Sequence, residues 1–92
     1  MKIDWVQDDK YKVRRDPRYT ADIVITEDVE AQFVVQRDEH SRAKRWAFLI
    51  YLDTEVPMLS GGGFFSLDQA KDACRDEWRN FALAIAESAE VV

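Results

Sequence analysis

The stretch FFSLDQAKDACRDEWRNFALAI, from Phe64 to Ile85, most constrains what this chain can fold into. Ser66 comes directly before an apolar-periodic run, and Gln69 follows three residues later, which is the spacing of a helix capping box. From there, apolar residues recur at steps of three and four, so they share one face of a helix at about 100° per residue. These residues are Leu67, Ala70, Cys74, Trp78, Phe81 and Ile85. The pattern predicts an amphipathic helix that buries this face against the rest of the chain.

Two hydrophobic residues near this helix have separate expected roles. Phe65, just before Ser66, is expected to pack against Ala70 as a hydrophobic staple at the helix start. Leu83 falls on the solvent side, where it is either a contact point for a partner or one of the exposed leucines that are common on protein surfaces.

Three segments before the helix have the composition of β-strands. Asp22–Thr26 is β-branched and apolar, and Ala31–Arg37 alternates between apolar and polar residues. Arg45–Leu52 has two apolar rows, one containing Trp46 and the other Leu49, which is typical of a central strand. A single helix covers one row, so the N-terminal segment, a partner or a second copy is expected to cover the other.

The remaining segments are less regular. Residues 1–20 fit either a short strand at Lys10–Arg14 or a helical turn after Asp4, and an edge strand near Tyr11–Arg14 is the favoured interpretation. The glycines at 61–63 lack the Lys-Ser/Thr that completes a phosphate-binding loop, so a flexible bend from sheet to helix is expected there, with Phe64-Phe65 closing a short strand.

Together these elements predict an α+β fold: an antiparallel sheet of about four strands with one C-terminal α-helix packed on one face. The length of 92 residues fits a single domain spanning 1–92. The first residues, MKIDWVQDD, lack the apolar core of a signal peptide, and no apolar run approaches the ~18 residues that span a bilayer. A cytoplasmic protein is therefore expected, and the single cysteine agrees with that expectation.

The sequence offers little for catalysis. One histidine and one cysteine cannot form a His/Cys metal cluster within one chain. His40 is followed by a serine and preceded by carboxylates, but neighbours on one loop rarely achieve the geometry of a catalytic triad. Cys74 lies on the apolar helix face and is expected to be a small core residue. We therefore expect no enzyme, no cofactor, no bound metal and no small-molecule substrate.

Positive charge is concentrated, although the net charge is −5. Nine of the thirteen Lys and Arg residues lie between positions 10 and 18 or between 37 and 45. If both segments lie at the same end of the sheet, they form one patch that could contact nucleic-acid backbone or an acidic protein surface. The alternative is solvated charges, some of them paired with neighbouring carboxylates. The candidate partner-binding residues are Lys12, Arg14, Arg15, Arg18, Tyr19, Arg37, Arg42, Lys44 and Arg45.

The second half of the chain resembles a set of small phage and prophage proteins. The resemblance covers Arg45–Ile85 and lies in the strand containing Trp46, the bend Gly61-Gly62-Gly63-Phe64 and the helix start Ser66-Leu67-Asp68-Gln69-Ala70-Lys71. Stand-alone proteins of this length in such sets include anti-CRISPR inhibitors, which bind a host CRISPR effector and block target DNA from pairing or entering. The layout also resembles the arm-binding domain of phage integrases, which lays its sheet on DNA.

Two functions follow from this resemblance. The first is a non-enzymatic inhibitor that binds a host protein or ribonucleoprotein complex in the bacterial cytoplasm. The alternative is a small DNA- or RNA-binding module that uses its basic strand and loop directly.

Overall fold

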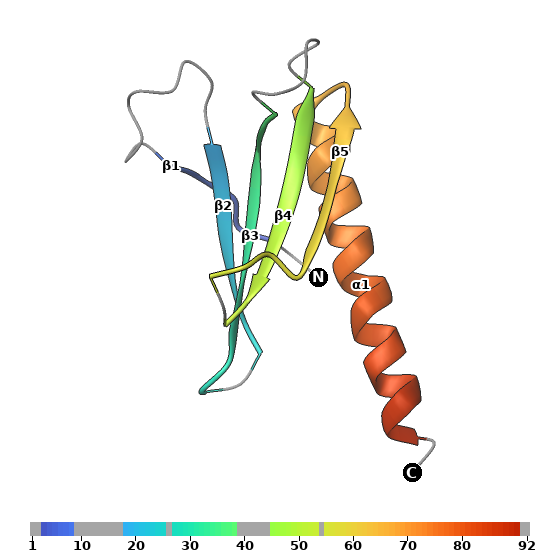
Figure 1. The fold of residues 1–92 in the computed structure, drawn as a ribbon. Helices are drawn as coiled ribbons and strands as arrows, with labels where there is room; N and C mark the ends of the chain where they lie inside the picture. Colours follow the sequence, from blue (N-terminus) through green and yellow to red (C-terminus); the bar gives the residue numbers. More distant parts are fainter. Residues whose placement is uncertain (1–2, 9–17, 26, 39–44, 54, 91–92) are drawn as a thin grey trace.

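A computed structural model describes residues 3–8, 18–25, 27–38, 45–53 and 55–90 of the protein (Figure 1). Five strands and one helix lie within these residues, and every neighbouring pair of strands is antiparallel in the order β1-β2-β3-β4-β5. The elements are β1 (Val6–Asp8), β2 (Arg18–Val24), β3 (Glu30–Arg37), β4 (Trp46–Leu52), β5 (Leu59–Phe64) and α1 (Leu67–Glu90). The predicted α+β fold is confirmed, and the sheet has one strand more than expected.

The central strands lie close to their predicted positions. In β4, Trp46, Phe48 and Ile50 are buried while the residues between them are half-buried, which is the alternation of a strand with a well-covered face and a less covered one. The strand predicted to begin at Asp22 begins four residues earlier, because Tyr19 and Ala21 continue the pairing with Val35 and Phe33. The edge strand expected near Tyr11–Arg14 falls outside the described residues, and the described edge strand on that side is β1.

The capping box predicted at the start of α1 is present. The backbone N–H of Gln69 donates to Ser66 Oγ at 3.1 Å, and the backbone N–H of Phe65 donates to Gln69 Oε1 at 3.0 Å. The first bond satisfies a donor that the first helical turn leaves without a partner, and the second ties the residue before the cap to that turn; together they fix where the helix begins.

The core lies between α1 and one face of the sheet. Phe33, Phe48 and Ile50 of the sheet are buried there, and Cys74 and Trp78 of the helix are buried against them. The indole of Trp78 meets the ring of Phe33 edge-on, with centroids 5.4 Å apart. This is the seam that the helical periodicity predicted.

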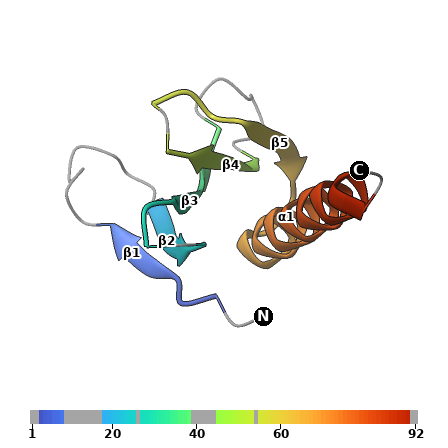
Figure 2. The same ribbon diagram turned by 90° about the horizontal axis from the view of Figure 1, so that it is seen from below.

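The N-terminal segment covers the same face as the helix. Trp5 packs on Phe33 with ring centroids 6.2 Å apart, and the view from below shows the N-terminal residues on the α1 side of the sheet (Figure 2). Residues 3–5 therefore add to the main core and do not cover the second face of β4.

The C-terminal part of α1 extends past β5 and diverges from the sheet (Figure 1). The prediction that Ile85 belongs to the core is wrong, because its side chain is 53% exposed. The helix has 24 residues and the longest strand has 8, so at ~1.5 Å and ~3.3 Å per residue the helix is roughly 10 Å longer than the strand. Leu83 is 56% exposed, as expected.

The glycines at 61–63 lie inside β5, so the prediction of a flexible bend is wrong. An added Cβ at Gly61 would lie 2.6 Å from Cε1 of Phe48, whose ring is in the core. The register with β4 shifts between Trp46 and Phe48, and Gly63 there has a φ of 81°. Gly61 thus allows close approach to a core ring, and Gly63 supplies the left-handed backbone at the register shift, a conformation that glycine adopts readily.

Candidate functional site

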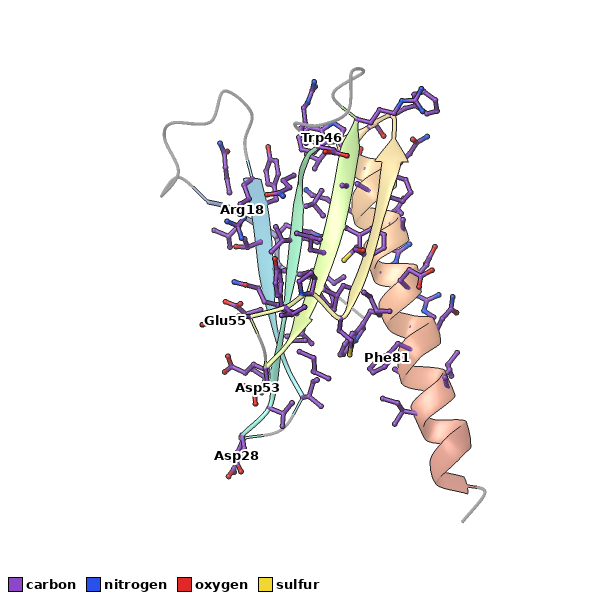
Figure 3. The ribbon with its side chains drawn as sticks, viewed as in Figure 1. Arg18, Asp28, Trp46, Asp53, Glu55 and Phe81 are labelled. Carbon is purple, nitrogen blue, oxygen red and sulfur yellow. The ribbon has the colours of Figure 1, made fainter. Side chains whose placement is uncertain are left out.

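Four of the nine candidate residues are described, and they lie at one end of the sheet. Arg18 opens β2, Tyr19 follows it, Arg37 closes β3, and Arg45 comes directly before β4. Antiparallel pairing brings these strand ends together. In Figure 3, Arg18 and Trp46 lie toward one end of the sheet, while Asp28 and Asp53 lie toward the other. We call this end of the sheet, with Arg18, Arg37 and Arg45, the basic end. The residues Lys12, Arg14, Arg15, Arg42 and Lys44 lie outside the described residues.

The described basic residues share an end of the sheet and not a face. Strand side chains alternate between faces, so Tyr19 and Arg37 lie on the helix side and Arg18 on the opposite side. The backbone N–H of Asp38 donates to the carbonyl oxygen of Arg45 at 2.7 Å, which continues the pairing of β3 and β4 to this end. The basic end is therefore a rim that runs around the end of the sheet.

Aromatic rings support the cations of this rim. Cζ of Arg37 lies 5.1 Å from the centroid of the Trp46 ring, and Cζ of Arg45 lies 4.3 Å from that of Phe65. Both distances are within the ~6 Å range of cation–π attraction. A guanidinium stacked on a ring is held in place by that ring, while its N–H donors point along its own plane, where a phosphate or carboxylate can accept them.

Two residues at this end were not predicted from the sequence. Lys71 of α1 places its Nζ 4.7 Å from the centroid of the Tyr19 ring and 5.6 Å from that of Trp5. Phe65 was expected to pack against Ala70, but its side chain is 75% exposed. A short strand closed by Phe64-Phe65 was predicted, but the pairing of Trp46 with Phe64, which places Phe65 beside Arg45, was the signal needed to find this contact.

Phe64, and not Phe65, packs inward. Its ring stacks on that of Phe48 with centroids 5.9 Å apart, which fills the space at the end of β5. The next residue in an extended chain points the other way, and the prediction of a Phe65 staple fails for this reason.

The opposite end of the sheet is acidic. Asp22, Glu30, Asp53 and Glu55 line a shallow depression of about 430 Å³. Figure 3 shows Asp28, Asp53 and Glu55 away from the basic end. Among the described residues, arginines gather at the basic end, where Asp38 also lies, and carboxylates gather at the opposite end, so the net negative charge of the chain does not describe the basic end.

The described residues contain no group of three or more His, Cys, Asp or Glu side chains that could hold a metal ion. Within the same part of the chain, no helix is both long enough and apolar enough to cross a membrane.

Cys74 is fully buried, and desolvation raises the pKa of its thiol to about 12. Because the thiolate is the reacting form, we expect a thiol reagent at about pH 8 to label the native protein far more slowly than the denatured protein. The ordinary pKa of the thiol is 9.0, so this group favours folding below that pH, and its contribution decreases as the pH rises from 9.0 toward 12. Equal labelling rates for native and denatured protein would contradict the buried position.

Comparisons with protein-family models, with curated proteins and with solved structures found no match to this chain.

Proposed function

We propose that this protein is a non-enzymatic, phage-type inhibitor that binds a host protein–RNA complex through the basic end and blocks its engagement with target nucleic acid, as anti-CRISPR proteins do. The observation that carries the proposal is the meeting of Arg18 at the start of β2, Arg37 at the end of β3 and Arg45 directly before β4, all at one end of the sheet. Arg37 and Arg45 are each held by an aromatic ring. No catalytic residue set competes with a binding role in the sequence.

The distribution of charge supports a specific orientation on such a partner. A chain with a net charge of −5 is repelled by polyanions at long range, so general binding to nucleic acid is disfavoured. The basic end can still approach phosphates or acidic side chains if the carboxylates of the depression, Asp22, Glu30, Asp53 and Glu55, point away. Such polarity selects one docking orientation and lowers the affinity for other orientations.

The test is charge reversal at the basic end. We expect the double variant Arg18→Glu/Arg45→Glu to lose inhibition in a phage-plating assay on a host with an active CRISPR system. Its affinity for the effector complex should decrease at least about tenfold, because each charged hydrogen bond contributes about 1.5–3 kcal/mol. Arg79→Glu on the exposed face of α1 is the control and should retain inhibition.

Thermal melts separate binding from folding in these variants. The double variant should melt within a few degrees of the parent, because Arg18 and Arg45 are only partly buried. Full inhibition by the double variant would refute the proposal. Submicromolar binding to free duplex or single strand at physiological salt, with a steep salt dependence and no capture of an effector complex, would instead establish the alternative of a small DNA/RNA-binding module.

A further inference from the structure

Phe65 is the exposed aromatic ring of the basic end. Its side chain is 75% exposed, whereas Trp46, which supports Arg37, is only 8% exposed. The guanidinium of Arg45 lies 4.3 Å from the Phe65 ring centroid. A ring with this exposure and one cation over it still presents apolar surface to solvent, at the end of the molecule where positive charge gathers.

The position of Phe65 is fixed by its neighbours. Its backbone N–H is bonded to Gln69 in the first turn of α1, and Phe64 before it pairs with Trp46. Phe65 therefore lies between the end of β5 and the start of α1, and the hydrogen bond and the strand pairing hold its backbone in place. An exposed ring on a rigid base loses little conformational entropy when it stacks on a ligand.

We infer that Phe65 and Arg45 form a stacking platform for an unpaired nucleobase, so the nucleic acid met by the basic end is single-stranded. The inference rests on the proposed function, in which the basic end contacts a protein–RNA complex. Bases in a duplex are covered on both faces by their neighbours, whereas an unpaired base can lie on an aromatic ring or on a guanidinium plane. Single-strand binders combine this stacking with a positively charged path for the backbone.

The remaining arginines of the basic end provide that path. Strands lie ~4.8 Å apart, so β2 and β5 are separated by about 14 Å across the sheet. A strand whose base rests on Phe65 can then pass Arg37 and reach Arg18 at the far side. This arrangement has one stacking position and two arginines along the backbone path, which predicts binding with little sequence preference.

The experiment measures binding of the full chain to a fluorescein-labelled oligothymidylate and to a labelled blunt-ended duplex at low salt, by fluorescence anisotropy. Phe65→Ala is expected to weaken binding to the single strand at least about fivefold, with the affinity for the duplex unchanged. Phe65→Tyr should restore the affinity because it keeps a ring. Leu83→Ala removes another exposed apolar side chain, on α1, and should change neither affinity.

The outcomes separate this inference from the proposed function. Equal single-strand affinities for the parent and Phe65→Ala would overturn the platform, and so would failure of the parent to bind the oligothymidylate. Loss of inhibition in Phe65→Ala without a change in single-strand affinity would also overturn it and would assign Phe65 to an apolar pocket of a protein partner. The proposed function is judged independently by the plating assay on Arg18→Glu/Arg45→Glu, whatever the result with oligothymidylate.

Discussion

Replacement of Trp78 by alanine is expected to lower the free energy of unfolding by at least about 3 kcal/mol. The indole is 8% exposed and contacts both Phe33 and Phe81, with ring centroids 5.4 Å and 5.8 Å away. Its removal leaves a cavity between α1 and the centre of the sheet, which the rigid β-strands cannot close. Chemical denaturation measures the loss, and the melting temperature should fall by about 12 °C or more for a domain of this size.

Arg79→Ala is the matched control for this experiment. Arg79 is the next residue of α1 and is exposed, so its replacement should cost less than about 0.5 kcal/mol. A smaller loss for Trp78→Ala than for Arg79→Ala would mean that the helix packs on the sheet by a different face.

Replacement of Gly61 by alanine is expected to destabilise the fold by about 1–3 kcal/mol. The new Cβ would lie 2.6 Å from Cε1 and 3.0 Å from Cζ of Phe48. The Phe48 ring is 2% exposed and stacked on Phe64, so it cannot move aside without disturbing the core. The measurement is again the free energy of unfolding in denaturant.

Gly62→Ala separates this clash from a general effect of losing a glycine. The nearest atom to a Cβ at Gly62 is Cβ of Ala47 at 3.6 Å, an ordinary van der Waals distance. This variant should therefore be neutral or slightly stabilising, because alanine restricts the unfolded chain. Equal destabilisation by both variants would mean that flexibility, and not the space under Phe48, is the reason for the glycines.

The sequence was sufficient to predict those parts of the fold that depend on one local signal, such as the spacing of apolar or capping residues along a helix. The stripe through Cys74 and Trp78 predicted the buried face of α1, and the spacing of Ser66 and Gln69 predicted its start; both are confirmed. The same periodicity could not predict how far along α1 the contact with the sheet extends. Periodicity gives the direction in which Ile85 points, but only the length of the sheet decides whether anything lies there to cover it.

β5 shows a second limit of sequence reasoning. Strand propensity is carried by side chains, so the three glycines at 61–63 have no such signal, and their extended conformation depends on pairing with β4. The same missing signal affected the candidate site, because the position of Phe65 follows from the pairing of β5 with β4. The grouping of arginines by segment was visible in the sequence, whereas the contact of Phe65 with Arg45 depends on where β5 ends.

The order of the strands has a consequence for how the chain reaches this fold. Each strand pairs with the one that precedes it, so the sheet can assemble hairpin by hairpin with short loops to close, which favours rapid folding. The helix, however, follows all five strands in the chain. During synthesis on the ribosome, Phe33, Phe48 and Ile50 therefore remain in contact with water until α1 emerges, and the nascent sheet gains most of its stability only then.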